Sequence, residues 1–170
     1  HDALPILSMF VSMAFTFASA RILGSVGYVM AFVVLAIFIL LGILFDIIGV
    51  SVTAASVAPF HSMAAHKERG ATAALRLIRS AEKVASICND VVGDISGIIS
   101  GATSALIVTK LVSDFSLSNL LLQLLISGLV TGATVGGKAA GKALALSNST
   151  SIVLDVGKLI SFFRRLFGKK

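Results

Sequence analysis

The sequence predicts an all-α integral membrane protein with about four transmembrane helices and further amphipathic helices at the membrane interface. Hydrophobic residues make up 56% of the 170 residues and charged residues only 13%, with a mean hydropathy of +1.01. An ordinary soluble domain carries about a quarter charged residues. No Asp, Glu, Lys or Arg lies between Asp2 and Arg21, between Arg21 and Asp46, or between Asp114 and Lys138. Each gap approaches or exceeds the roughly 17–25 residues with which a helix spans a bilayer.

The first two predicted spans lie near the amino terminus. Ala3–Ala20 is apolar, and residues 1–24 are therefore expected to form an extra amino-terminal transmembrane helix. A signal peptide is the alternative, which the missing basic flank disfavours. The second span runs from about Ser25 to Ala54 and contains the strongest apolar run, Tyr28–Phe45. Residues 25–170 are expected to form the remaining transmembrane domain.

Two further spans follow. The third begins near Lys83 and ends near Lys110, and the fourth runs from about Leu117 to Gly137. Cations concentrate before the third span and after the fourth. Basic loops remain in the cytoplasm, so these basic segments are predicted to be cytoplasmic in a multi-pass protein of the cell membrane.

Amphipathic interfacial helices are predicted at about 59–82 and 151–168. Pro59 suits a first helical position, and the residues that follow mix charged with apolar side chains. In the second segment, polar residues recur at three- and four-residue spacing opposite apolar ones, a pattern typical of helices that lie on the bilayer. Anionic lipid headgroups are expected to attract its basic end, which comprises Arg164, Arg165, Lys169 and Lys170.

Asp90 and Asp94 interrupt the third span and are four residues apart, so an α-helix places both on one face beside Asn89. A charge near the bilayer centre costs from about 2.5 kcal/mol upward, and such acids commonly mark an ion path. Carboxylate, amide and hydroxyl oxygens are the ligands that Mg²⁺ prefers. The alternative is that both acids lie near the headgroups and are solvated.

Small residues recur every four positions on the third and fourth spans. The third span carries Gly93, Gly97, Gly101 and Ala105, beside a row of Ser96, Ser100 and Ser104. The fourth span carries Gly128, Gly132 and Gly136. Such rows let helix backbones approach closely. They predict tight contacts, either within one chain or along a homodimer seam.

An enzyme is not expected, because no nucleophile, base and oxyanion donors can be assembled from the sequence. The run Gly136–Lys142 matches a phosphate-binding loop in part, but Ala143 stands where the Mg²⁺-binding hydroxyl is required. Cys88 is the only cysteine, so no disulfide forms within the chain. The lipid bilayer is the expected surrounding, and no nucleic-acid partner is expected.

Three stretches resemble motifs of one family. Gly49–Ala54 resembles a small-Ser-Glu-x-Ala element, Ile87–Gly93 a Gly-Asn-x-x-x-Asn element, and Gly137–Leu146 a Gly-Glu-x-x-Pro-Lys-x-Leu-Ala element. These motifs belong to the transmembrane domain of the CNNM/CorC family, proteins associated with Mg²⁺ and Co²⁺ transport. The resemblance extends from Gly49 to Phe167, and the sequence has no counterpart of the family's CBS domains.

The resemblance implies a dehydrated divalent cation bound between helices of a homodimer by oxygens of these motifs. Ser51 and Asn89 are retained. The departures are Val52 for the first Glu, Gly93 for the second Asn, Lys138 for the Glu of the third motif and Gly141 for its Pro. Asp90 and Asp94 would restore the lost charge, or would pair with Lys138 and Lys142 and close the site.

We therefore expect a homodimeric membrane transporter of a divalent cation, with Mg²⁺ as the expected ion and no other cofactor. The expected metal ligands are Ser51, Asn89, Asp90 and Asp94, and the residues expected to modulate the site are Gly93 and Lys138. The alternative is a non-transporting structural or regulatory membrane protein in which Lys138 replaces the bound ion.

Overall fold

The computed structural model describes residues 27–115 and 119–167, together with Ile6, Met9, Phe10, Met13, Ala14 and Phe17. In this described part, every regular element is helical, which confirms the predicted all-α class. Three helical stretches are long and apolar enough to cross a membrane, namely Tyr28–Ala54, Ala81–Asp114 and Leu120–Ser147. They correspond to the second, third and fourth predicted spans. Most of the helix expected at residues 1–24 lies outside the described residues.

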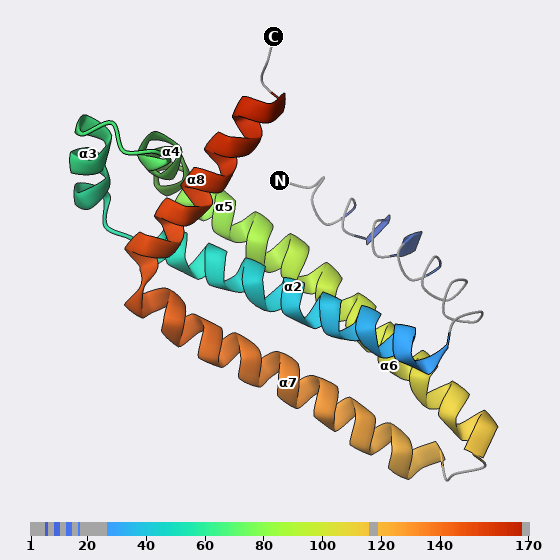
Figure 1. Cartoon of the computed structure of the whole chain (residues 1–170). Helices are drawn as coiled ribbons and strands as arrows, with labels where there is room; N and C mark the ends of the chain where they lie inside the picture. Colours follow the sequence, from blue (N-terminus) through green and yellow to red (C-terminus); the bar gives the residue numbers. More distant parts are fainter. Residues whose placement is uncertain are drawn as a thin grey trace. The chain divides into compact units, whose positions relative to one another are not determined.

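The helices follow one another with short connections (Figure 1). In chain order they are α2 (Tyr28–Ala54), α3 (Val57–Ala65), α4 (Ala71–Arg79), α5 (Ala81–Ser86), the π-helix η1 (Ile87–Gly93), α6 (Asp94–Phe115), α7 (Asn119–Ser147) and α8 (Ser149–Phe167). The elements α5, η1 and α6 form one continuous helix.

The chain divides into two compact units, each assembled from two stretches of sequence. The first unit comprises His1–Ile43 and Val91–Ala139, and the second comprises Leu44–Asp90 and Ala140–Lys170. The long helices α2 and α7 therefore contribute residues to both units. Each unit has its own packing, described separately below.

In the first unit, α2 and α6 contact each other at two levels. The Tyr28 hydroxyl donates hydrogen bonds to the Lys110 carbonyl at 3.2 Å and to the Asp114 carboxylate, and the Lys110 ammonium lies 5.2 Å from the centre of the Tyr28 ring. At Gly42, an added Cβ would lie 3.2 Å from the Cβ of Ser96. The two contacts are fourteen residues apart on each helix and run in opposite directions along the sequence, so the helices pack antiparallel.

The row of small residues that packs on α6 is the serine row. Ser96, Ser100 and Ser104 are buried, whereas Gly97 and Gly101 are exposed and an added Cβ at either would meet nothing within 4 Å. The Ser100 and Ser104 hydroxyls donate to the carbonyls of Gly97 and Gly101. The expectation of a tight intrachain contact along the glycine row was therefore wrong for these two glycines.

Three glycines of α7 also have free space where a side chain would lie. An added Cβ at Gly128, Gly132 or Gly136 would meet nothing within 4 Å in the described residues. At Gly137, in contrast, it would lie 2.3 Å from Cδ1 of Ile43, so this glycine permits close approach to α2. The predicted fourth span stopped at Gly137, but α7 continues to Ser147 because the Ala- and Leu-rich residues that follow favour a helix.

The second unit packs α3, α4 and α8 around one hydrophobic core. Its buried members are Val52, Ala55, Phe60, Ala71, Ala74, Leu75, Val153 and Leu154. Gly70 and Gly157 let the backbones of α4 and α8 touch, since an added Cβ at Gly157 would lie 2.5 Å from the Gly70 carbonyl oxygen. This contact joins two segments that are distant in sequence.

The segment at 59–82, where interfacial helices are predicted, contains most of α3, all of α4 and the start of α5. A turn after α3 reverses the chain before α4, with left-handed backbone at Lys67 (φ 56°) and Gly70 (φ 87°). Glycine adopts this conformation without steric penalty, so Gly70 suits the position immediately before α4. The amphipathic helix predicted at 151–168 corresponds to α8 (Ser149–Phe167), and its place at the membrane interface stays a prediction.

Candidate functional site

The candidate site lies in the second unit, where the end of α2 contacts η1. Gly49 is buried on α2, and an added Cβ there would lie only 2.2 Å from Oδ1 and 2.9 Å from Cγ of Asn89. The amide of Asn89 therefore occupies the space that any side chain at position 49 would need. This contact brings two of the three family-like motifs together.

Two buried oxygens in this unit have no hydrogen-bond partner. They are Oγ of Ser51, whose residue is 0% exposed, and Oδ1 of Asn89. The nearby Thr53 differs, because its hydroxyl donates to the Val50 carbonyl at 2.9 Å. A buried polar group left unpaired costs about 1–3 kcal/mol, and such groups usually have a water or an ion as partner. Each of these oxygens is therefore an unsatisfied polar atom on an apolar helix, Ser51 on α2 and Asn89 on η1.

The helix that carries Asn89 is a π-helix from Ile87 to Gly93. Widened turns of this kind are frequent at functional sites. Sequence reasoning assumed a regular α-helix and did not find this feature, since its residues show no pattern that distinguishes the two helix types. The π-helix coincides with the Asn-containing motif.

The predicted carboxylates are not buried beside these oxygens. Asp90 is exposed, and its Oδ2 accepts a hydrogen bond from the Ser86 hydroxyl at 2.9 Å. Asp94 is the first residue of α6 and is also exposed. It belongs to the first unit, as do the buried Gly93 and the half-buried Lys138. Of the six predicted site residues, the second unit contains Ser51, Asn89 and Asp90.

The described residues contain no cluster of three or more His, Cys, Asp or Glu side chains that could hold a metal ion. The two buried, unpartnered oxygens of the candidate site belong to a serine hydroxyl and an asparagine amide. Serine and asparagine are not among the residue types of such a cluster. Cys88, adjacent to Asn89, is buried and has a free thiol. A cation in this position would depend on neutral oxygens for its direct contacts.

Sequence reasoning missed two residues with unusual surroundings. Gly49 was noted only as a small residue of a motif, although its missing side chain is what admits Asn89. Thr103, in the first unit, is 0% exposed and has a buried hydroxyl oxygen without a partner. A threonine in an apolar helix gives no signal that its hydroxyl lacks a bond.

No family model, curated protein or solved structure matches the chain. The resemblance to the CNNM/CorC transmembrane domain therefore rests on the three motifs quoted above.

Proposed function

We propose that this protein transports a divalent cation, Mg²⁺, across the cell membrane through a polar site that contains Ser51 and Asn89. The observation that carries the proposal is the pair of buried, unpartnered oxygens on these two residues. Hydroxyl and amide oxygens are suitable ligands for hard cations. Their positions also match the two oxygen-bearing residues that the family resemblance retains.

Negative charge for a divalent ion would come from Asp90 and Asp94. Both are exposed in the described structure and lie within Ala81–Asp114, a helical stretch that is long and apolar enough to cross a membrane. An exposed carboxylate inside a bilayer is costly unless it faces a polar path or a partner, so its presence favours a function over simple packing.

A homodimer is part of the proposal. Asp94, Gly97, Gly101 and Ala105 follow one another at three- and four-residue spacing on α6, and all four are exposed. A second copy packed along this face would cover the carboxylate and use the open glycines for close backbone contact. Asp94 would then lie on the helix face that the second copy covers.

The alternative function is a non-transporting structural or regulatory membrane protein. Lys138 favours this alternative. It is half-buried on α7 and stands where the motif of the CNNM/CorC family has a glutamate. A lysine ammonium there would repel a cation and could take the place of the ion. The two hypotheses make opposite predictions for added metal.

Thermal denaturation of the purified protein in neutral detergent tests the proposal. Mg²⁺ at a hundred times its Kd should stabilise the folded protein by about 2.7 kcal/mol. Ser51→Ala, Asn89→Leu and Asp94→Asn should weaken this effect. Thr53→Val is the matched control, because that hydroxyl is already bonded within α2. Uptake of Mg²⁺ into liposomes that contain the parent protein then measures transport directly.

Two results would reject the proposal. If the parent shows no metal-specific shift while Lys138→Glu gains one, the ion-free alternative is favoured. If Ser51→Ala and Thr53→Val respond to Mg²⁺ in the same way as the parent, the two buried oxygens are not the cation site.

A further inference from the structure

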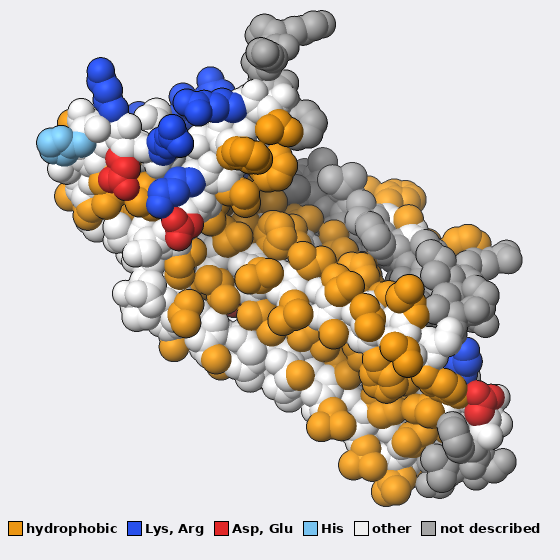
Figure 2. Space-filling view, in the orientation of Figure 1, with side chains coloured by type: hydrophobic (Ala, Val, Ile, Leu, Met, Phe, Trp, Pro, Cys, Tyr) orange, Lys and Arg blue, Asp and Glu red, His pale blue; other side chains and the backbone are white. Residues whose placement is uncertain are grey.

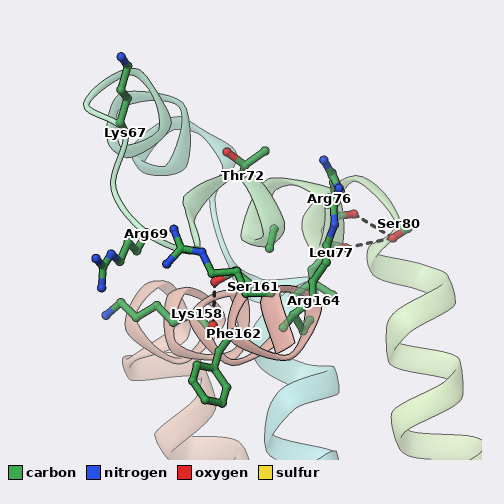
Figure 3. Close-up of a pocket in the computed structure, with 14 residues that line it drawn as sticks. Lys67, Arg69, Thr72, Arg76, Leu77, Ser80, Lys158, Ser161, Phe162 and Arg164 are labelled. Carbon is green, nitrogen blue, oxygen red and sulfur yellow. Dashed lines mark hydrogen bonds between the residues drawn. The ribbon is translucent and has the colours of Figure 1, made fainter. Parts of the chain in front are cut away.

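A strongly basic pocket lies between α4 and α8 in the second unit (Figure 3). Its volume is about 990 Å³, and its lining contains six cationic side chains and no Asp or Glu. The cations are Lys67, Arg69, Arg76, Lys158, Arg164 and Arg165. In Figure 2 the Lys and Arg side chains gather over this unit.

The pocket follows from the way the two helices cross. The backbones of Gly70 and Gly157 are in contact, because an added Cβ at either glycine would overlap the other segment. Both helices continue beyond this contact, α4 to Arg79 and α8 to Phe167. The side chains on the continuing segments, with those of the turn before α4, line the pocket. The backbone contact between Gly70 and Gly157 therefore holds together the two segments that line the pocket.

Little negative charge offsets these cations. Lys158 pairs with Asp155 at 2.9 Å, but the two side chains are 47% and 71% exposed, and such a surface pair contributes only about 0–1 kcal/mol. Among the residues that the structure describes, the other five cations have no ion pair with a carboxylate. A bound anion would reduce the mutual repulsion of these cations.

The donors that face the pocket favour a phosphate group. Four of the six cations are arginines, whose planar guanidinium groups match phosphate oxygens in a two-bond geometry. Ser80 and Ser161 also line the pocket, but their hydroxyls donate to carbonyls one turn earlier, as the dashed lines in Figure 3 show. Thr72 also lines the pocket, and the six cations supply its positive charge.

Apolar side chains border the same pocket on α8. Ile160 and Phe162 belong to its lining and are 40% and 57% exposed. Leu159, Phe163 and Leu166 of the same helix are exposed as well. A helix with basic and apolar surfaces of this kind lies at the boundary between headgroups and acyl chains. The pocket thus offers cations for a headgroup and an apolar surface for its lipid chains.

We propose that the pocket between α4 and α8 binds a phosphate-bearing anion, and that this anion is the headgroup of an anionic phospholipid. Basic pockets of membrane proteins at the cytoplasmic surface bind such headgroups. A soluble phosphate compound shares the same chemistry, so the experiment separates the two sources. The proposal does not depend on cation transport.

The test uses the full chain in neutral detergent and measures binding of short-chain lipids. Dioctanoyl phosphatidylinositol bisphosphate and dioctanoyl phosphatidylglycerol represent lipids, and inositol trisphosphate and inorganic phosphate represent soluble anions. We expect saturable binding of the two lipids, tighter for the one with more phosphates. Weaker binding of inositol trisphosphate than of its lipid counterpart would show the contribution of the acyl chains. Binding should also weaken at high salt.

Arg76→Gln and Arg79→Gln form a matched pair on α4. Both arginines are exposed, but only Arg76 lines the pocket. Arg76→Gln should weaken lipid binding about fivefold, the effect of one cation near an anionic surface, whereas Arg79→Gln should leave it unchanged. Circular dichroism should show the same helix content in both variants.

The outcomes separate clearly. Equal losses in the two variants, or no saturable binding of any probe, would overturn the pocket as an anion site. Equal affinity for inositol trisphosphate and its lipid would overturn the phospholipid assignment and identify a soluble phosphate ligand. Loss of lipid binding with Arg76→Gln alone would support the proposal.

Discussion

The core of α3, α4 and α8 and the surface of α7 use apolar residues in opposite ways. In the former, Phe60, Ala71, Ala74 and Val153 are 0% exposed and pack against one another. In the latter, the most apolar 18-residue window of Leu120–Ser147 contains no buried residue. The first arrangement is typical of a water-soluble core, and the second is typical of a helix whose apolar surface needs lipid or another helix around it.

This difference indicates where substitutions should affect folding. Removing volume from the α3–α4–α8 core leaves a cavity, because its neighbours are fixed on all sides. A change on the open face of α7 or α6 removes or adds volume where the chain itself makes no contact. The folding stability of a single chain should therefore depend on the α3–α4–α8 core. Association with lipid or with a second copy should depend on the open faces of α6 and α7.

The largest expected effect is at Phe60. Phe60→Ala should lower the free energy of unfolding by about 3–5 kcal/mol, since this side chain is completely buried. Phe162→Ala is the control, because Phe162 is 57% exposed and its removal should cost at most about 0.5 kcal/mol. Denaturation in detergent measures both. Similar losses in the two variants would show that the core described here does not hold this unit together.

A pair of glycine substitutions gives the next effect. Gly157→Ala should destabilise the protein by about 1–3 kcal/mol, because the new Cβ would meet the Gly70 backbone at 2.5 Å. Gly132→Ala should instead be neutral or stabilising by up to about 1 kcal/mol, since nothing lies within 4 Å and alanine favours a helix. The melting temperature of Gly157→Ala should fall, and that of Gly132→Ala should stay the same or rise. Equal destabilisation would mean that α7 packs as tightly as α8.

The smallest effect on folding is expected at Gly97. Gly97→Leu should change the folding free energy of a single chain by no more than about 0.5 kcal/mol, since the position is exposed and open. It should nevertheless prevent dimer formation, which light scattering in detergent would detect. Gly97→Ala, which adds one methyl group, should retain the dimer. A large loss of stability in Gly97→Leu monomers would place this face against the same chain.

The sequence predicted what depends on hydropathy and periodicity. Two sequence patterns each predicted a helix that the structure contains. They are the apolar run Tyr28–Phe45 and the polar residues at three- and four-residue spacing between Asp155 and Arg165. Such patterns extend over many residues, so local exceptions do not hide them. Membrane topology and sidedness remain predictions from charge.

Predictions of which face of a helix packs against the rest of the chain were less successful. Glycine and serine rows on α6 are both small, and only tertiary packing decides that the serines are buried. Serine hydroxyls can bond to their own helix, as Ser100 does with Gly97, so a buried serine row has no polar cost that would reveal it in the sequence.

The candidate site was predicted in part. Ser51 and Asn89 were selected through a resemblance, and the structure places both with buried, unpartnered oxygens. The role of Gly49 depends on a contact between distant segments, and η1 depends on a local change in helix type. Neither has a residue pattern that a single sequence displays.

The contact of Tyr28 with Lys110 and Asp114 provides a built-in optical probe. The chain contains one tyrosine and no tryptophan, so its intrinsic emission arises from a single ring. That ring is bonded through its hydroxyl to a carboxylate and has an ammonium beside it, both of which alter tyrosine fluorescence. Any separation of the start of α2 from the end of α6 would change the emission of the unlabelled protein. Movements at this end of the helix pair can therefore be followed in real time without introducing a dye.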